Sequence, residues 1–374
     1  MDFTASCLFG LEKLVGEDID NLGLTRKNTI DGHVTFSGDI SAAAECNINF
    51  RYAERLYINA GEFRAATFDE LFEGTKAIDW AEYIGSADEF PVKGHCVRSK
   101  LFSVPDCQRI IKKAVADSLC SAYKTKTLPE TGNKIQIVFF IFNDTASLMI
   151  DTSGDALYKR GYRQMSVAAP LRETLAAAMV KLSRPREGVI LCDPFCGSGT
   201  IPIEAALLCT NTAPGLKRRF AGEKMPFIPA KAWERAREKA KDSIIRRETP
   251  IFGSDIDKSS VELSEQNAKL AGVNGIVSFA KADARHFASP VQGARGTIVT
   301  NPPYGERLGE KEEMFVLYKE FGKAIRENVP MWQLYILNSN PDFPIYFGKK
   351  PDKVRKLYNG MIKCGLFQYF KNNI

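Results

Sequence analysis

The sequence predicts an α/β protein: a mostly parallel, doubly wound sheet with an antiparallel terminal hairpin, preceded by an α+β region. From Val189 to Ser339, short apolar and β-branched runs alternate with helical patterns, which is typical of parallel strands joined by helices. Two further apolar runs flank Asn359-Gly360, a dipeptide that favours a two-residue hairpin turn. Upstream of Val189, strands and helices are expected without that regular alternation.

The N-terminal region is expected to mix short strands with several helices. Residues 1–60 combine short apolar runs with a helical pattern around 41–52. Apolar residues at helical spacing predict a helix over 67–84 and a strongly amphipathic one over 103–124. The other expected elements are a strand at 90–99, two strands within 134–154 that turn at Asn143-Asp144, and a basic turn within 155–182 followed by a helix from about Pro170.

The C-terminal half is expected to alternate strands with helices as far as its final hairpin. The expected strands are 188–193, 250–257, 275–283, 296–301 and 332–339. The expected helices are 199–209, 259–271 and 312–328. Ligands bind at the carboxyl ends of the strands in such sheets, so functional residues are expected there.

Length and composition indicate a soluble protein of more than one domain. A chain of 374 residues exceeds one ordinary core, and 44% apolar with 26% charged residues is typical of globular proteins. No apolar run could span a bilayer, and the acidic start lacks the pattern of a secretory signal. Nine scattered cysteines without a CxxC pair, and three separated histidines, predict free thiols in the cytoplasm and no metal site. A monomer is the default expectation.

Charge is distributed unevenly along the chain. Residues 1–90 contain 7 Lys or Arg and 17 Asp or Glu, a net charge of −10. Residues 91–134 contain 9 against 3, and residues 210–250 contain 11 against 5, a net charge of +6 in each. Two basic segments behind an acidic first quarter favour a polyanionic partner, although solvated helix faces would give the same pattern.

The first strand of the C-terminal sheet runs into a glycine-rich turn, DPFCGSGT, from Asp193 to Thr200. Gly197 and Gly199 permit a sharp turn and a close approach to a ligand, beside the free N–H groups of the following helix. A phosphate P-loop would need a lysine after its glycines, and a dinucleotide fold would need a third glycine; this turn has neither. The acidic Asp193 instead suits a ligand with an ammonium and a sulfonium group, and a plain structural turn is the alternative.

Carboxylates also follow the next two strands. Asp255 ends the second strand, where it can accept both hydroxyls of a ribose, and Asp283 follows the third, where it can accept from an adenine amino group. A single aspartate at such a position is more often a helix cap or a turn residue. Three of them on successive strand ends, beside one glycine-rich turn, favour a common ligand site.

The fourth strand ends in Asn301-Pro302-Pro303-Tyr304. Proline lacks an N–H group and fixes φ, so the carbonyls at this corner are expected to stay in place and unpaired. The Asn301 side-chain oxygen and the Pro302 carbonyl can hold both hydrogens of an exocyclic amine, which aims its lone pair at an electrophile. Tyr304 can stack on the ring that carries the amine. The alternative is a rigid turn with a solvent-facing tyrosine.

DPFCGSGT, GSDID, KAD and NPPY together resemble S-adenosylmethionine-dependent methyltransferases of the Rossmann-like class I fold, in their amino-methylating branch. With LYKRGYR and APLRETLAAA upstream, nearly the whole chain resembles the THUMP-containing RNA guanine-N2 methyltransferases, namely the bacterial 23S rRNA enzymes and their tRNA relatives. NPPY alone is not specific, because DNA adenine-N6 and release-factor glutamine methyltransferases share it. The resemblance implies a ferredoxin-like piece at 1–60, a THUMP RNA-binding domain at 61–155, a linker and helix at 156–187, and a methyltransferase domain at 188–374.

The resemblance also implies a role for each motif. The turn after Asp193 would hold the methionine end of S-adenosylmethionine, Asp255 its ribose and Asp283 its adenine. The residues implied to bind the cofactor are Asp193, Phe195, Cys196, Gly197, Ser198, Gly199, Thr200, Asp255, Ile256, Asp283, Ala284 and Asn301. Those implied to hold the target base and to be catalytic are Asn301, Pro302, Pro303 and Tyr304.

The sequence departs from a common methyltransferase in one respect, since Asp255 lies 62 residues after Asp193, against about 20 in the dinucleotide pattern. The excess is largely the basic segment 210–250, which indicates an inserted helical excursion near the site. It either touches an RNA backbone or is a solvated covering helix.

The hypothesis that follows is methyl transfer from S-adenosylmethionine to a guanine N2 in RNA, with 23S rRNA the favoured substrate. The alternatives are a tRNA guanine-N2 methyltransferase, a DNA adenine-N6 or protein glutamine methyltransferase, and a non-catalytic RNA-binding protein. An NAD enzyme is disfavoured by the missing third glycine. Neither a membrane nor a metal partner is expected.

Overall fold

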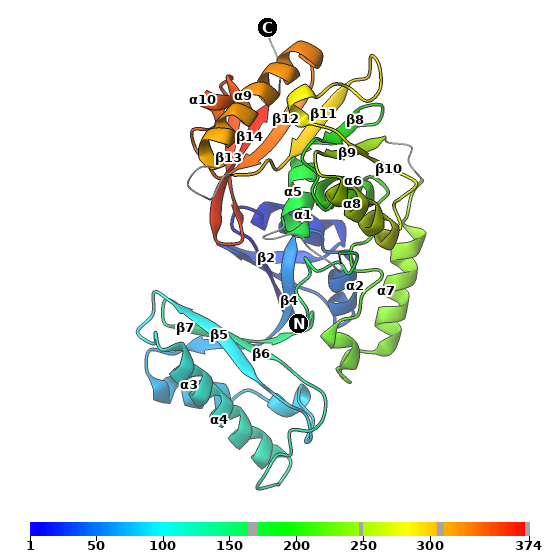
Figure 1. Cartoon of the computed structure of the whole chain (residues 1–374). Coiled ribbons are helices and arrows are strands. Elements are labelled where there is room, and N and C mark those ends of the chain that lie inside the picture. Colours follow the sequence, from blue (N-terminus) through cyan, green and yellow to red (C-terminus); the bar gives the residue numbers. More distant parts are fainter. Residues whose placement is uncertain (164–170, 247–249, 305–309, 371–374) are drawn as a thin grey trace.

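The structure is a computed structural model of the chain that describes residues 1–163, 171–246, 250–304 and 310–370. Two seven-stranded sheets, one from each half of the chain, dominate the described residues (Figure 1). Each sheet mixes parallel and antiparallel pairs. They differ in how much of their surface is covered by helices.

The N-terminal sheet is built from two halves that share one long strand. Its strands are β1 (Asp2–Cys7), β2 (Thr25–Ile30), β3 (His33–Ser37), β4 (Ala53–Arg64), β5 (Val92–Val97), β6 (Ile137–Phe142) and β7 (Thr145–Asp151), in the order β2-β3-β1-β4-β7-β6-β5. Its helices are α1 (Glu12–Asn21), α2 (Ala42–Asn49), α3 (Phe68–Lys76) and α4 (Val104–Ala122), with a 3-10 turn at Trp80–Glu82. Strand β4 pairs with β1 along its first half and with β7 along its second, so the two halves form one continuous surface.

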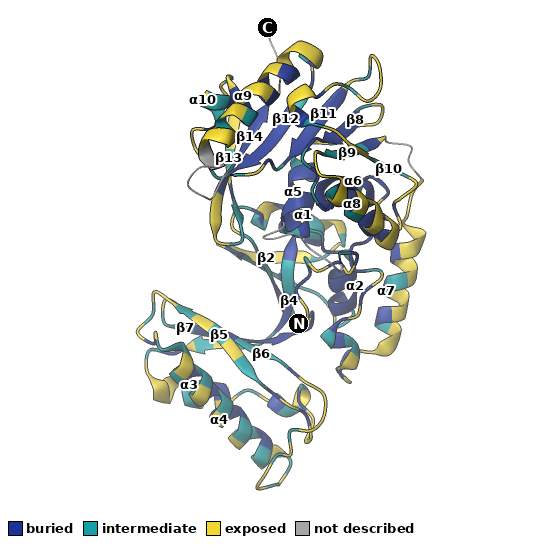
Figure 2. Ribbon diagram, viewed as in Figure 1, coloured by how far each residue is buried: buried dark blue, intermediate teal, exposed yellow. Residues whose placement is uncertain are grey.

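Helices cover one face of this sheet. Ile58 of β4 lies opposite Ile150 of β7, which lies opposite Ile137 of β6, and all three side chains are completely buried. On the other face the side chains of β5 and β6 are exposed or half-buried (Figure 2). This alternation is the pattern of an antiparallel sheet with one face packed on a core and the other open.

Several expected N-terminal elements have different bounds. The helix expected over 67–84 ends at Lys76, because the chain turns back there; the fully buried Trp80 donates its indole N–H to the Thr75 carbonyl at 2.8 Å. The turn expected at Asn143-Asp144 is confirmed, with both residues at positive φ, 50° and 60°, as a two-residue hairpin turn of this kind requires.

The C-terminal sheet has the expected alternation of strands and helices. Its strands are β8 (Ile190–Asp193), β9 (Ile251–Asp255), β10 (Val277–Lys281), β11 (Gly296–Thr300), β12 (Gln333–Asn338), β13 (Lys353–Asn359) and β14 (Ile362–Tyr369), in the order β10-β9-β8-β11-β12-β14-β13. Its helices are α5 (Glu173–Leu182), α6 (Thr200–Cys209), α7 (Ala230–Asp242), α8 (Lys258–Ala271), α9 (Glu310–Asn328) and α10 (Phe343–Phe347), with 3-10 turns at Ala221–Lys224 and Ala284–His286. The five strands β8 to β12 are parallel, and β14 is antiparallel to both neighbours, so the predicted fold class is confirmed.

The central strands β8, β11 and β12 of this sheet are buried on both faces. Along β11, Ile298 packs into one apolar cluster and Val299 into another on the opposite face. Leu334 and Tyr335 of β12 alternate in the same way. Burial on both faces explains why these strands are almost continuously apolar in sequence, and it leaves the strand ends as the places where polar chemistry reaches solvent.

The basic segment 210–250 does not lie near the carboxyl ends of the strands, where the site is expected, contrary to the prediction. It leaves the end of α6 and returns at the start of β9, so it lies at the amino ends of the parallel strands. Its helix α7 packs against α2, and Lys239 pairs with Glu45 at 3.1 Å (Figure 1). The segment therefore bridges the two halves of the molecule. None of the helices in the described ranges has the length and apolar character of a membrane span.

Candidate active site

The carboxyl ends of β8, β9 and β11 meet at the centre of the C-terminal sheet. Strand β8 lies between β9 and β11, which makes it the point where the strand order reverses and where ligands bind in such sheets. The Thr300 hydroxyl donates to Asp193 Oδ1 at 2.6 Å, and the Phe195 amide donates to the same oxygen at 3.1 Å. Because Thr300 immediately precedes Asn301, the proline corner adjoins the glycine-rich turn.

Asp193 is a buried carboxyl group with an altered pKa. Its pKa is raised to about 7, chiefly by burial; the hydrogen bonds from Thr300 and Phe195 lower the pKa, and the nearby Asp255 raises it. A carboxyl group in this position favours a cationic ligand, because a nearby positive charge stabilises the ionised form that burial penalises.

The glycine-rich turn leaves one side open and is held firmly from the other. Gly197 and Gly199 have φ values of +51° and +79°, which side chains rarely adopt. A Cβ on Gly197 would meet no described atom within 4 Å, whereas a Cβ on Gly199 would meet Ser264 Cβ at 3.0 Å. The Ser264 hydroxyl donates to the Gly197 carbonyl at 2.7 Å and the Asn267 amide to the Ser198 carbonyl at 2.9 Å. Helix α8 thus supports the turn and leaves its open side for a ligand.

Asp255 lies beside this turn. Its Oδ2 accepts from the Gly197 amide at 2.9 Å, and its Oδ1 accepts from the Asp257 amide at 3.0 Å. The next side chain, Ile256, is 57% exposed although it is apolar. Asp257 caps α8 through the amides of Ser259 and Ser260, so it has a structural role.

Asp283 lies one strand further out and already has partners. It caps the short 3-10 turn, and both of its oxygens accept from the Arg285 guanidinium. The hydrogen bonds to Arg285 lower the pKa of Asp283, so the group stays ionised. The Ala282 amide donates to the Asp255 carbonyl at 3.0 Å, which holds the two strand ends together, and Ala284 is buried behind them.

The proline corner is rigid, but its polar atoms are not all unpaired. The Tyr304 hydroxyl donates to Asn301 Oδ1 at 2.5 Å, and the Pro303 carbonyl accepts from the Tyr318 hydroxyl at 2.5 Å. The expectation of unpaired carbonyls is therefore wrong for Pro303. Within the described residues, no group donates to the Pro302 carbonyl. The residues after Tyr304, 305–309, lie outside the described ranges.

Comparison with protein-family models shows to which family this chain belongs. The model described as "RMKL-like, methyltransferase domain" matches residues 160–368, more than half of the chain. The chain belongs to the RMKL-like methyltransferase family. Models for the RlmL ferredoxin-like domain and the THUMP domain match residues 2–57 and 65–151. The two halves of the N-terminal sheet are therefore a ferredoxin-like domain and a THUMP domain, as the resemblance implied.

Known proteins resemble this RMKL-like methyltransferase along its whole length. The "Putative RNA methyltransferase YpsC" of Bacillus subtilis is 41% identical over 369 residues, which are 98% of this chain and 95% of that protein. A structure of "SMU.472, a putative methyltransferase complexed with SAH" is 37% identical with a TM-score of 0.92, covering 100% of this chain and 98% of the other. A "predicted N6-adenine-specific DNA methylase" from Listeria monocytogenes is 41% identical with a TM-score of 0.93, covering 99% and 96%.

Buried charged residues connect the RMKL-like methyltransferase domain to the domains that precede it. The Arg163 guanidinium donates to Thr200 Oγ1 at 3.2 Å, to Glu173 Oε2 at 3.1 Å and to the Leu171 carbonyl at 3.0 Å. Since Thr200 begins α6 directly after the glycine-rich turn, Arg163 links the segment that follows the THUMP domain to that turn.

A second set of buried contacts extends this link to the ferredoxin-like domain. The Tyr162 hydroxyl donates to Glu204 Oε1 at 3.1 Å, and Arg160 Nε lies 3.6 Å from the same atom. The Arg160 guanidinium also donates to the carbonyls of Phe50 and Arg51, which lie between α2 and β4. These contacts therefore connect the ferredoxin-like domain to Glu204 of α6.

Sequence reasoning did not assign these residues a role. A signal was present, because Glu204 is the one acid in the otherwise apolar helix IPIEAALL, and a buried carboxylate requires a partner. Nothing in the sequence identified the partners as Tyr162 and Arg160, which lie 42 and 44 positions away. Burial also raises the pKa of Glu173 to about 7, against the lowering effect of Arg163.

Proposed function

We propose that this protein transfers a methyl group from S-adenosylmethionine to the exocyclic N2 amine of a guanine in RNA, with 23S rRNA as the substrate. The observation that supports this most is the hydrogen bond of 2.6 Å from Thr300 to Asp193. It brings the amine-binding corner against the turn that would hold the methyl donor. A corner remote from that turn could not perform the transfer.

The residues at the strand ends fit S-adenosylmethionine. The open side of Gly197 gives room for a ligand against the backbone, and the buried Asp193 carboxyl suits the cationic methionine end. Asp255 would accept the ribose hydroxyls, and the exposed Ile256 would pack on the adenine, with Asp283 and Ala284 nearby. The remaining residues of this site are Phe195, Cys196, Ser198, Gly199 and Thr200. The SAH found with SMU.472 supports this assignment.

The proline corner would hold the acceptor amine. S-adenosylmethionine supplies a methyl group on a sulfonium, which is a strong electrophile. Asn301 Oδ1 and the Pro302 carbonyl would accept the two amine hydrogens, and the Tyr304 ring would stack on the base. For this the Tyr304 hydroxyl would have to share or give up its hydrogen bond to Asn301. Pro303 is held by Tyr318 and would keep the corner rigid.

RNA as the substrate is supported by the THUMP and ferredoxin-like domains and by the similarity to YpsC. The guanine N2 and 23S rRNA assignments rest on the resemblance of LYKRGYR, APLRETLAAA and NPPY to the guanine-N2 enzymes. A tRNA guanine is the nearest alternative. Transfer to adenine N6 of DNA is a second candidate, favoured by the relative described as a DNA methylase.

Nucleoside mass spectrometry distinguishes these substrates. We expect 23S rRNA from cells that lack this gene to have lost one N2-methylguanosine, and the purified protein with labelled S-adenosylmethionine to restore it. Parallel incubations with tRNA, DNA and protein from the same cells test the alternatives. Label that appears only as N6-methyl-2′-deoxyadenosine in DNA, or only in tRNA, would contradict the 23S rRNA assignment.

A further inference from the structure

A wide groove crosses the face of the N-terminal sheet that the helices leave open. Its volume is about 1460 Å³, more than the roughly 300–1,000 Å³ of a small-molecule site. The walls come from β1, β3 and β4 of the ferredoxin-like domain, from β5 to β7 of the THUMP domain, and from residues between 219 and 224 of the methyltransferase domain. A groove built by all three domains suits a ligand that extends across them.

A strip of aromatic rings lies along this groove. Phe140 and Phe142 lie on the same face of β6, and their rings are stacked with centroids 5.8 Å apart and an interplanar angle of 7°. The His33 ring stacks on Phe140 at 4.9 Å. Since β1, β4 and β7 separate β3 from β6 in the sheet order, this contact shows that the open face curls into a trough.

The rings of Phe140 and Phe142 are partly accessible to solvent, unlike another phenylalanine on the same strand. Phe139, on the helix-covered face, is completely buried, whereas Phe140 and Phe142 are only half-buried. Clustered apolar rings that face solvent on a soluble protein mark an interaction surface. Aromatic side chains in a basic groove are the surfaces on which unpaired bases stack.

Positive charge lines the groove around these rings. The walls contain six Lys or Arg side chains and four Asp or Glu side chains. Lys93, Arg98 and Lys134 lie on the THUMP side and Lys224 on the methyltransferase side, and none of the four has an ion-pair partner within the described residues. Arg219 adds a cation whose side chain is 87% exposed and which pairs with Glu223 at 2.7 Å.

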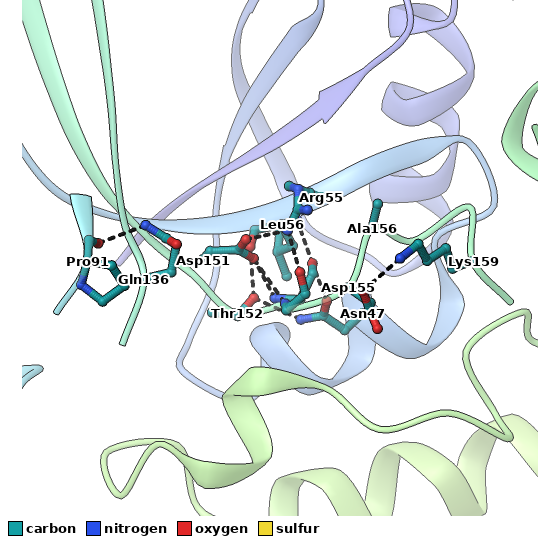
Figure 3. Close-up of polar contacts among 12 residues, drawn as sticks. Asn47, Arg55, Leu56, Pro91, Gln136, Asp151, Thr152, Asp155, Ala156 and Lys159 are labelled. Atoms are coloured by element: carbon teal, nitrogen blue, oxygen red, sulfur yellow. Dashed lines mark hydrogen bonds and ion pairs between the residues drawn. The ribbon is translucent and has the colours of Figure 1, made fainter. Parts of the chain in front are cut away.

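Half of the acids in the groove are already neutralised. Asp151 pairs with Arg55 at 2.5 Å, and Asp155 pairs with Lys159 at 3.0 Å (Figure 3). The polar cluster in Figure 3 therefore offers little net negative charge to a polyanion, and the unpaired cations determine the sign of the surface.

A chain of contacts connects the groove to the proline corner. Phe9, which lines the groove, makes an edge contact with Tyr358 of β13 at 5.8 Å. The neighbouring residue of β13 pairs with Cys364 of β14, whose Sγ lies 3.7 Å from the Tyr304 hydroxyl. A single ligand could therefore occupy the groove while one of its groups reaches the corner.

We propose that this groove binds a single-stranded stretch of the RNA substrate, with bases stacked on Phe140, Phe142 and His33 and phosphates held by Lys93, Arg98, Lys134, Arg219 and Lys224. The proposal rests on the proposed function in taking RNA as the polymer. A duplex is disfavoured, because its bases are stacked on one another and cannot reach the rings, whereas unpaired bases can.

Fluorescence anisotropy with a labelled twelve-nucleotide single-stranded RNA, and with a blunt duplex of the same length, tests this on the full chain without cofactor. We expect tighter binding of the single strand, and about tenfold weaker binding of it by Phe140→Leu. Phe68→Leu, on the exposed side of α3 across the sheet, is the matched control and should bind as the unchanged protein does. Equal binding of the duplex, or equal effects of the two variants, would overturn the proposal.

Salt dependence tests the phosphate contacts separately. The double variant Lys93→Gln/Lys134→Gln should reduce the slope of log K against log salt by about 1.4, since each single-strand phosphate contact contributes about 0.7. Lys113→Gln, on α4 beside Phe72, should leave the slope unchanged. An unchanged slope in the double variant would contradict the assignment of these lysines.

Two further measurements distinguish a misfolded variant, and a wrong proposed function, from a groove that does not bind RNA. Photo-crosslinking of the unchanged protein to 4-thiouridine RNA should label the peptide that contains Phe140 and Phe142, and label confined to other segments would overturn the proposal. If RNA is methylated but the groove variants bind and methylate it normally, the groove proposal fails and the proposed function stands. If DNA or protein alone is methylated, the proposed function fails instead.

Discussion

The two sheets of this protein have the same number of strands and use them in opposite ways. The N-terminal sheet packs one face on helices and leaves the other open, so its polar and aromatic side chains point outward along the strands. The central strands of the C-terminal sheet are buried on both faces, and the polar side chains Asp193, Asp255 and Asn301 lie at or just beyond their carboxyl ends. An open face suits contact with an extended polymer, whereas converging strand ends suit one small ligand and one reacting group.

Between the two sheets lies the buried connection through Arg160, Tyr162 and Arg163. It ties the residues just before β4 to α6, and it reaches the proposed cofactor site at Thr200. Variants can therefore be aimed separately at the proposed chemistry at the strand ends, at the proposed binding on the open face, and at stability at the junction.

The largest effect is expected at the strand ends. Asn301→Ala should reduce methyl transfer by about 10³-fold, because it removes an acceptor that orients the amine. Binding of S-adenosylmethionine and of RNA should persist, which tritium transfer and calorimetry can measure on the same preparation. Asn274→Ala, in an exposed loop, is the control. Equal loss of transfer and cofactor binding would count against this role.

The junction should show the next largest effect, in stability. Arg163→Met would leave Glu173 buried without its charge partner, which should lower the free energy of unfolding by about 3 kcal/mol. Urea denaturation measures this, and the added change Glu173→Gln should restore part of the loss. Arg109→Met, at a mostly exposed arginine, should change it little. A loss below about 1 kcal/mol for Arg163→Met would show that the contact is dispensable.

A smaller effect, on cofactor affinity, is expected at Asp255. Asp255→Ala should weaken S-adenosylmethionine about thirtyfold, because the ribose would lose charged hydrogen bonds and the Gly197 amide its partner. Asp257→Ala should affect stability rather than affinity, since that residue caps α8. Calorimetric titration separates the two variants. An unchanged dissociation constant for Asp255→Ala would refute the ribose assignment.

The smallest expected effect is a pH dependence through Asp193, whose pKa burial raises to about 7. A cationic ligand requires the ionised form, so affinity for S-adenosylmethionine should fall by about tenfold per pH unit below 7 and level off above it. For the ligand-free protein the sign is opposite: the folded state holds the proton more tightly than the unfolded chain, so this group's contribution to stability declines as pH rises from about 4 to about 7. Asp193→Asn should abolish the pH dependence of S-adenosylmethionine binding. If the affinity of this variant still changes with pH, the titrating group is not Asp193.

Sequence reasoning succeeded where local pattern and burial agree. The strands β8, β11 and β12 are apolar over most of their length because both faces are covered. The hairpin turn at Asn143-Asp144 was predictable because two residues there need positive φ. These signals lie within a few residues of the element that they specify.

It failed where the decisive contact joins distant segments. Strand β2, TRKNTI, is mostly exposed, so it carries no apolar alternation from which it could be predicted. The helix expected over 67–84 was too long because the burial of Trp80 ends it, and the segment 210–250 was placed at the wrong end of the sheet. Local sequence does not record which distant residues will cover an element.

By itself, then, the sequence determined the architecture of the C-terminal sheet and the residues gathered at its strand ends, since parallel strands must bring their carboxyl ends to one edge. Only the tertiary structure decided that His33 reaches Phe140 across a curled sheet, that Arg163 holds the first residue of α6, and that Tyr304 lies against Asn301. Strand twist and side-chain packing set those contacts over the whole molecule, and no short stretch of sequence encodes them.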